Sequence, residues 1–410
     1  MFLAKDTIAH TENACAHRPN FAFHDNMPIT DMLSQLETPA LLLDEKRMYR
    51  NIQRMQKRMD LFGVKFRPHA KTSKCPEVVR RQIAAGAKGI TVSTLKEAER
   101  FHAAGIEDIL YAVAIAPAKF GHALKLIQSG LKLTLLVESV AAAKELTQFG
   151  IDQRQQFDVL IEVDTDNHRS GIAPEAPLLL DVANALRVDG RYGAQLRGVM
   201  THAGSSYALH SEEDLVAMAE QERVGCVRAA HRLRSAGYLC DVVSVGSTPT
   251  ALSARSLDGV TEVRAGVYVF FDLVMAEIGI CKKEDIALSV LCTVIGHRPQ
   301  AGWIITDGGW MAMSRDRGTQ KQPHDYGYGL VCDIAGSPIE SLVFNEANQE
   351  HGVLTWRGDT SVDIEQRFPI GSQIRVVPNH ACATGAQHAA YQVLPIDGNL
   401  LATWSRFSGW

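Results

Sequence analysis

The chain has 410 residues, of which 46% are apolar and 21% charged, and its formal net charge is −4. This length allows two domains, one of which could be a barrel of about 250 residues. Lys and Arg are dispersed rather than striped, which argues against nucleic acid as a partner. No run approaches the ~20 apolar residues that span a bilayer. The chain therefore has the composition of a globular protein that works away from nucleic acid and membrane.

Cysteine usage bears on the compartment. Eight cysteines occur without CxxC pairs, which predicts reduced thiols and a cytoplasmic protein. Met1 to Met27 hold several histidines and carboxylates but no apolar core, so a signal peptide is not expected. We expect residues 1–35 to be an N-terminal extension that is either mobile or packed on a partner subunit.

Residues 36–284 alternate short apolar runs with amphipathic segments. Strands are expected at 39–44, before Lys71, and at 89–93, 108–113, 131–137, 157–163, 196–201, 240–245 and 260–263. Helices are expected at 45–60, 76–85, 96–104, 118–129, 141–149, 177–186 and 212–236. Buried strands separated by helices predict a parallel sheet.

This α/β pattern fits either a closed (β/α)8 TIM barrel or an open doubly wound sheet. No GxGxxG follows the first strand, and polar side chains follow several different strands, which favours the barrel. These side chains are Lys71, Ser93, Asp164, His202 and Ser247.

Residues 285–410 have a different sequence pattern, with short segments rich in β-forming residues at 287–296, 302–306, 353–356 and 372–377. They predict a C-terminal antiparallel β domain that covers the barrel mouth. The strand near Pro39 could join this domain instead of the barrel.

The stretch RPHAKTSK at 67–74 places Lys71 just after a predicted strand, where α/β folds hold their chemistry. If Lys71 is buried beside the cationic Arg67 and Lys74, its pKa falls and its amine can form a Schiff base. A solvated loop lysine is the alternative.

Three further stretches suggest a cofactor. DTDNHRSG at 164–171 follows a strand, and the planar fork of Arg169 could meet a phenolate, a ring nitrogen or a carboxylate; a solvated loop is the alternative. VGSTPT at 245–250 and RAGVY at 264–268 supply small residues and hydroxyls that let backbone N–H groups approach a phosphate.

His380 and Cys382 stand two residues apart after a predicted strand. In extended geometry such residues share one face, so both could bind one metal ion. Imidazole and thiolate suit Zn²⁺, with the remaining positions open to water or substrate. A chance HxC pair is the alternative.

Taken together, these stretches resemble the fold-type III pyridoxal-phosphate enzymes, whose first domain is the alanine racemase-like barrel. Within them the chain is most similar to the D-serine dehydratase and D-threonine aldolase group. The resemblance spans residues 36–410. Its longest motifs are GITVSTLKEAE (89–99), THAGSSY (201–207), VVSVGSTPTAL (242–252), DGVTEVRAGVYVFFDLVM (258–275), WMAMSRDRGT (310–319), ANQEHG (347–352) and PNHACATGAQ (378–387).

The resemblance implies that Lys71 carries pyridoxal 5′-phosphate and serves as the base for the α proton. It also implies that His380 and Cys382 bind a divalent ion (Zn, Mg or Mn), and that Arg169, or its rival Arg264, contacts the ring. The other expected cofactor-binding residues are His202, Tyr207, Gly246, Ser247, Thr248, Gly266 and Tyr268.

The activity implied by the resemblance is elimination of water from a D-3-hydroxyamino acid, with D-threo-3-hydroxyaspartate giving oxaloacetate and ammonia. His-x-Cys, rather than His-x-Asp, favours the dehydratases over the aldolases. The alternatives are a D-serine dehydratase, an aldolase of D-threonine or D-3-hydroxyaspartate, an amino acid racemase and a non-catalytic cofactor-binding protein. A homodimer is expected from the same resemblance.

Overall fold

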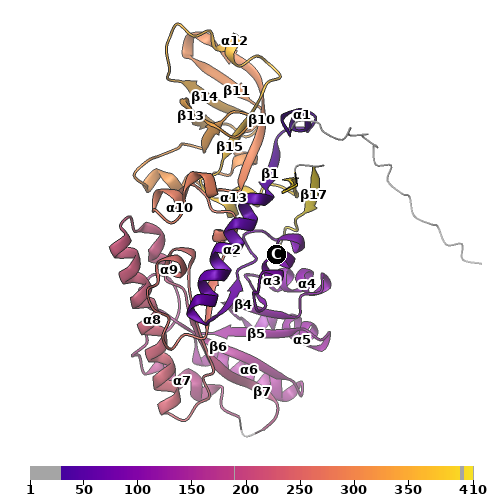
Figure 1. Ribbon diagram of the computed structural model, residues 1–410. Coiled ribbons are helices and arrows are strands. Elements are labelled where there is room, and N and C mark those ends of the chain that lie inside the picture. The colour runs from indigo at the N-terminus through magenta and orange to yellow at the C-terminus, as the bar shows by residue number, and fades with distance from the viewer. Residues whose placement is uncertain (1–28, 189, 398–400, 410) are drawn as a thin grey trace, which may run out of the picture.

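The computed structural model describes residues 29–188, 190–397 and 401–409 (Figure 1). Most of the expected N-terminal extension lies outside the described residues. The described chain begins with the short helix α1 (Ile29–Ser34), in which Met32 and Leu33 are buried.

The first of two sheets has eight parallel strands in the order β2-β9-β8-β7-β6-β5-β4-β3. The strands are β2 (Lys65–Pro68), β3 (Ile90–Val92), β4 (Asp108–Ala114), β5 (Lys132–Val137), β6 (Gln156–Val163), β7 (Gly193–Thr201), β8 (Val242–Val245) and β9 (Glu262–Ala265). A parallel bridge between His69 and Thr91 joins the two edges, and the Ala70 N–H donates to the Thr91 carbonyl at 2.8 Å. The sheet is thus an almost closed barrel, which confirms the predicted architecture.

Helices surround this barrel (Figure 1), and all of them except α9, which begins within the stretch at 245–250, were predicted from the sequence pattern. They are α2 (Glu45–Phe62), α3 (Pro76–Ala84), α4 (Leu95–Ala103), α5 (Phe120–Gln128), α6 (Val140–Asp152), α7 (Leu178–Ala185), α8 (Glu212–Ser235) and α9 (Thr248–Ser253). Helix α2 illustrates the cause: Met48, Ile52, Met55 and Met59 recur at helical spacing and all four are buried.

The second sheet has nine strands in the order β11-β14-β13-β12-β15-β10-β1-β16-β17. Its strands are β1 (Ala40–Asp44), β10 (Leu288–Arg298), β11 (Trp303–Thr306), β12 (Leu330–Cys332), β13 (Pro338–Ala347), β14 (Gly352–Trp356), β15 (Gln373–Val377), β16 (Ala390–Leu394) and β17 (Ala402–Ser405). All pairings are antiparallel except β1 with β16.

Strand β1 belongs to this second sheet and not to the barrel, as the stated alternative for the strand near Pro39 allowed, so the barrel boundary at residue 36 is replaced. β1 pairs with β10 on one side and with β16 on the other. Its last residue, Asp44, is also the N-cap of α2, accepting from the Arg47 N–H at 2.8 Å. The chain therefore crosses from the β domain to the barrel at Asp44.

Strands β12, β13, β16 and β17 were missed by the sequence pattern, because several of their residues are half-exposed and no long apolar run marks them. Figure 1 shows this domain above the barrel, with α10 (Leu273–Glu277) and α13 (Ala381–Gly385) between the two. Among the described residues, every helix is too short or too polar to cross a membrane.

Candidate active site

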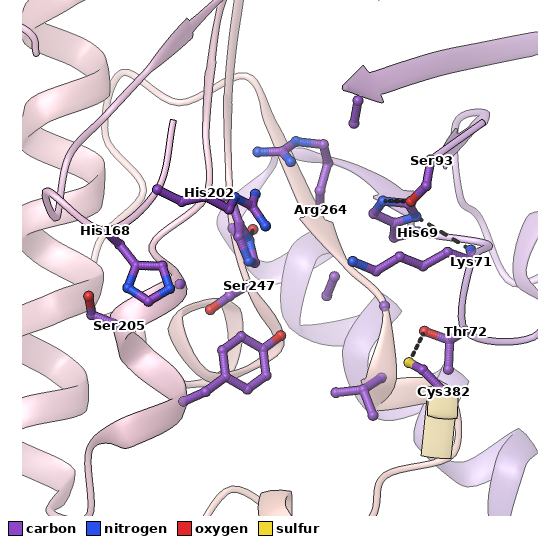
Figure 2. A pocket seen from close by; sticks show the side chains of 18 of the residues that line it. His69, Lys71, Thr72, Ser93, His168, His202, Ser205, Ser247, Arg264 and Cys382 are labelled. Atoms are coloured by element: carbon purple, nitrogen blue, oxygen red, sulfur yellow. Dashed lines mark hydrogen bonds between the residues drawn. The ribbon is translucent and has the colours of Figure 1, made fainter. Parts of the chain in front are cut away.

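A cavity of about 1040 Å³ opens where the barrel mouth meets the β domain. The loops that follow the barrel strands line most of it, and residues 316–322 and 380–382 of the β domain contribute the rest. This is the edge at which parallel α/β barrels place their functional side chains. Figure 2 shows side chains from both domains pointing into the same space.

Lys71 lies on a tight turn after β2, where the Lys74 N–H donates to the Ala70 carbonyl at 2.8 Å. Its neighbours Thr72 and Ser73 are buried, whereas the Lys71 side chain is exposed and extends into the cavity (Figure 2). The expectation that Lys71 is buried is therefore wrong.

The two cations thought to act on Lys71 are both neutralised by carboxylates. Arg67 pairs with Glu262 at 2.7 Å and with Asp108 at 2.6 Å, and Lys74 pairs with Glu97 at 3.2 Å. Their charges therefore stabilise the barrel rather than act on the Lys71 amine. What the structure gives Lys71 is access to the cavity.

Two histidines stand beside Lys71. Burial lowers the pKa of His202 to about 4, and Lys71 and Arg264 act in the same direction, against the hydrogen bond to Gly246. Burial likewise lowers the pKa of His69 well below its usual value, aided by Lys71. The ring of His202 contacts the Gly246 carbonyl through Nδ1 at 3.0 Å, which requires an N–H at that nitrogen in the neutral ring. Both histidines are therefore neutral at pH 7.

The two candidate arginines differ in burial and in hydrogen bonding. Arg264 is buried, and its guanidinium donates to the Ser244 hydroxyl at 2.9 Å and to the Thr201 carbonyl. Burial lowers the pKa of Arg264, although Glu262 opposes this shift. Arg169 also lines the cavity but is exposed, and it makes no hydrogen bond within the described residues. Both remain candidates for the ring contact.

Two glycines allow close approach of a ligand to the backbone. Gly246 has φ +128°, and a Cβ there would stand 2.2 Å from the Arg264 carbonyl oxygen. A Cβ on Gly266 would stand 3.0 Å from the Thr72 hydroxyl oxygen. Ser247, between the strand and α9, caps that helix by accepting from the Thr250 N–H at 3.2 Å. Small residues are thus required on this wall of the cavity.

Thr248 and Tyr268 lie behind this wall and do not line the cavity. The Thr248 hydroxyl accepts from the Tyr268 N–H at 3.2 Å, and the Tyr268 hydroxyl accepts from Gln82 at 2.8 Å. Their side chains are therefore engaged behind the wall, and their expected part in holding the phosphate, through the backbone of these stretches, stays a prediction. Tyr207 does line the cavity, with its ring centroid 6.2 Å from that of His202, and burial raises its pKa.

His380 and Cys382 converge on the cavity, but not through extended geometry. His380 is the N-cap of α13 and Cys382 stands in its first turn, so a strand-to-helix turn brings them together. The Cys382 thiol contacts the Thr72 hydroxyl at 3.4 Å, beside Lys71. Burial would lower the pKa of His380, yet Asp316 and Cys382 outweigh it and raise the pKa to about 11. For Cys382, burial is outweighed by His380, which lowers the thiol pKa.

Asp316 is a site residue that the sequence did not single out. Its carboxylate lies 2.5 Å from Nδ1 of His380. The motif WMAMSRDRGT contained Asp316, but only folding brings it beside a residue 64 positions away. Asp272, fully buried, accepts from the Ala381 N–H at 3.0 Å and so fixes the same turn. Within the part of the chain that the structure describes, no three His, Cys, Asp or Glu side chains form a ready metal site.

Comparison with known proteins agrees with this geometry. Residues 43–274 match the family model of the alanine racemase N-terminal domain, and residues 287–394 match that of a putative serine dehydratase domain. The chain is 59% identical to D-threo-3-hydroxyaspartate dehydratase of Delftia sp. (strain HT23), over 93% of this chain and 100% of that protein. The chain belongs to the alanine racemase-like dehydratase family.

Solved structures support the same family. The Delftia enzyme superimposes with a TM-score of 0.90 at 59% identity, over 92% of this chain and 100% of that one. Other solved structures of D-threo-3-hydroxyaspartate dehydratase are a cysteine-to-alanine mutant in the metal-free form and a histidine-to-alanine mutant, and the two substituted positions are two residues apart. The chain is also 30% identical to a D-serine dehydratase of Dictyostelium discoideum, over 93% of this chain and 99% of that protein.

Proposed function

We propose that this family member is a dehydratase dependent on pyridoxal 5′-phosphate and a divalent metal, which converts D-threo-3-hydroxyaspartate into oxaloacetate and ammonia. One observation carries the proposal: the accessible Lys71 amine and the His380–Cys382 pair open into one cavity, linked by the contact of Cys382 with Thr72. The similarity to the Delftia enzyme over 93% of the chain supports the choice of substrate.

The cavity suits the cofactor. The Lys71 amine is accessible for a covalent bond, and Gly246 and Gly266 leave room for a phosphate against the backbone. Ser247 and Tyr207 line the same wall, whereas Thr248 and Tyr268 would support it from behind. The bound cofactor supplies an electron-accepting ring that stabilises negative charge on the substrate's α carbon.

Arg264 and Arg169 divide the polar contacts to cofactor and substrate. Arg264 offers a cation held by Ser244 and Thr201, and the exposed Arg169 offers one that makes no hydrogen bond within the described residues. Because His202 is neutral, it can remain against the cofactor without adding positive charge. Lys71 would remove the α proton and hold it on Nζ.

The metal donors also fit. On metal binding, Nε2 of the His380 imidazolium would lose its proton and become the ligand atom, while Nδ1 keeps the proton donated to Asp316. Imidazole and thiolate favour Zn²⁺ over Mg²⁺ and Mn²⁺, which prefer oxygen donors. A divalent ion there would act as a Lewis acid on the β-hydroxyl, because hydroxide leaves poorly near neutral pH. The two substituted positions of the Delftia enzyme, two residues apart, support this assignment.

The second carboxylate of 3-hydroxyaspartate requires a cation near the metal donors. Lys321 lines the cavity from the segment Gly318–Lys321, and Thr319 of that segment donates to Asn379 at 3.0 Å, next to His380. We assign the distal carboxylate to Lys321, because the β carbon carries both the hydroxyl and that carboxylate.

The protein is further proposed to be a cytoplasmic homodimer. All cysteines within the described ranges are unpaired, which supports a reducing compartment. Sedimentation velocity on the purified protein tests the dimer, and a monomer would contradict it.

A substrate panel tests the reaction. Release of 2-oxo acids (oxaloacetate, pyruvate and 2-oxobutyrate, respectively) is measured from D-threo-3-hydroxyaspartate, D-serine and D-threonine, together with the aldolase products glycine and glyoxylate or acetaldehyde. We expect oxaloacetate from the first to be the fastest product. Pyruvate as the dominant product would favour the D-serine dehydratase alternative, and glyoxylate with glycine would favour the aldolase.

Variants separate the cofactor from the metal. Lys71→Ala should remove the yellow absorbance of the bound cofactor, whereas Lys65→Ala, at the opposite end of β2, should retain it. EDTA or Cys382→Ala should abolish turnover without removing that absorbance, and His351→Ala, on an exposed turn, should change neither. A colourless wild-type protein would contradict the cofactor proposal.

A further inference from the structure

Arg406 is a buried cation at the very end of the described chain, outside every motif discussed so far. It follows β17, whose pairing with β16 places Ser405 opposite Ala390. The Arg406 N–H donates to the Ala389 carbonyl at 2.7 Å, which fixes the backbone at this point. The side chain then enters the junction between the barrel and the β domain.

The guanidinium of Arg406 bonds to both sides of that junction. Towards the barrel, Nε donates to the carbonyl of Ser73 at 2.9 Å, two residues after Lys71 and 333 positions before Arg406. Towards the β domain, Nη1 donates to the carbonyl of Gly385, the last residue of α13, and to that of His388 at 2.9 Å. One planar group thus joins the turn that carries Lys71 to the helix that carries Cys382.

Neighbouring contacts reinforce this bridge. The Tyr391 hydroxyl donates to the Ser73 carbonyl at 2.9 Å and accepts from Nε of Arg406 at the same distance. The Phe407 N–H donates to the Lys74 carbonyl at 3.0 Å, and its ring packs edge-on against Phe101 of α4 at 4.8 Å. The C-terminal segment therefore donates hydrogen bonds to two carbonyls of the turn that carries Lys71, those of Ser73 and Lys74.

We propose that Arg406 is a positioning residue that sets the distance between the Lys71 amine and the Cys382 thiolate. This inference rests on the proposed function, in which Lys71 acts on the α carbon and the metal ligand Cys382 serves the β-hydroxyl of the same substrate. The two groups must act on adjacent carbon atoms, so their spacing matters more than the position of either. A displacement of about 1 Å can cost on the order of 10²-fold in rate.

The guanidinium of Arg406 has four acceptors, some on the barrel side of the junction and some on the β-domain side, and this explains why the residue is an arginine. The five N–H donors of guanidinium lie in a rigid plane and can serve acceptors on both sides, whereas a lysine ammonium is a point charge on a flexible stem. Arg406→Met removes all four side-chain bonds, and the Ser73 and Gly385 carbonyls then keep only the Tyr391 hydroxyl and the His388 N–H. Arg406→Lys keeps the charge but can reach fewer acceptors.

Two reactions of the holoenzyme separate positioning from general damage. Exchange of the substrate α proton with deuterium from D₂O requires Lys71 and the bound cofactor, whereas oxaloacetate formation requires the metal donors as well. In Arg406→Met we expect the ratio of exchange to oxaloacetate formation to rise at least tenfold, and in Arg406→Lys to rise less. A merely structural role would lower both rates together and leave the ratio unchanged.

Amide hydrogen exchange supplies a second measurement that does not depend on activity. In Arg406→Met, peptides covering residues 70–75 and 381–388 should both exchange faster than in the wild type. Arg232→Met is the matched control, since Arg232 also donates to backbone carbonyls, those of Pro174 and Ala176, but on the outer side of the barrel between α8 and α7. It should alter neither peptide nor the rate ratio.

Several outcomes would overturn the inference. They are an unchanged rate ratio in both Arg406 variants, or loss of protection at only one of the two peptides. If Arg406→Met does not fold, Arg406→Lys carries the same measurements. A wild type that forms no oxaloacetate would refute the proposed function, and the amide exchange would still show whether Arg406 couples the two segments.

Discussion

The pH dependence of stability should reveal His202 as a histidine that is kept neutral by the fold. Its ring is mostly enclosed in the cavity wall and bonds to the Gly246 carbonyl. Burial lowers its pKa to about 4 from the ordinary 6.5. Between these two values the unfolded chain binds a proton that the folded protein does not. Stability contributed by this group is therefore present above pH 6.5 and is lost as the pH falls towards 4.

The size of the effect follows from these two pKa values. At pH 5 the unfolded histidine is almost fully protonated and the folded one is almost fully neutral. The free energy of unfolding is therefore about 2 kcal/mol lower at pH 5 than at pH 7. His202→Gln removes the titrating group and should remove this part of the pH dependence. The exposed His351 provides the control, since His351→Gln should leave the wild-type dependence intact.

The assay is urea unfolding of the ligand-free protein at pH 7 and at pH 5. The wild type should lose about 2 kcal/mol more than His202→Gln between the two conditions. Equal losses in the two proteins would refute the reasoning, as would an NMR titration that places His202 near 6.5.

Three further predictions follow from single contacts. Gly246→Ala places a methyl group 2.2 Å from a backbone oxygen of β9, at a residue with φ +128°. It should lower the unfolding free energy by about 1–3 kcal/mol and weaken cofactor binding in an absorbance titration. Gly121→Ala is the control, because its added Cβ meets nothing within 4 Å. Arg67→Met leaves the buried Glu262 without its cation and should lower the unfolding free energy by about 3–5 kcal/mol. Asp108 keeps its second partner, Lys132. Lys132→Met removes only that exposed partner and should lower the unfolding free energy by under about 1 kcal/mol. Lys321→Ala should reduce the preference for D-threo-3-hydroxyaspartate over D-serine by about tenfold or more, and an unchanged ratio of kcat/KM would contradict its assigned role.

Much of the barrel could be predicted from the sequence because the relevant signals are local. Apolar runs and helical spacing mark buried strands and amphipathic helices wherever they lie, so β4 to β8 and helices such as α2 were expected at nearly their observed positions. Lys71, His380 and Cys382 were noticed because their residue types and spacing carry chemistry by themselves.

Other features were decided by pairing and packing between distant segments. The apolar run of β1 has no local signal for its partners, and only the fold places it between β10 and β16 rather than in the barrel. Likewise, the sequence showed Tyr268 beside a glycine-bearing loop, but the packing against α3 turns its hydroxyl away from the cavity.

The sequence by itself determined the family, the barrel with its β domain, and the lysine and His-x-Cys pair on which the proposed chemistry depends. Only the tertiary structure decided that Lys71 is exposed in a cavity while Arg67 and Lys74 are paired elsewhere. It alone brought Asp316 to His380, and Arg406 to Ser73 across 333 positions. The physical reason is that residue type and periodicity are local properties, whereas ion pairs and hydrogen bonds between distant segments exist only after the sheets have closed.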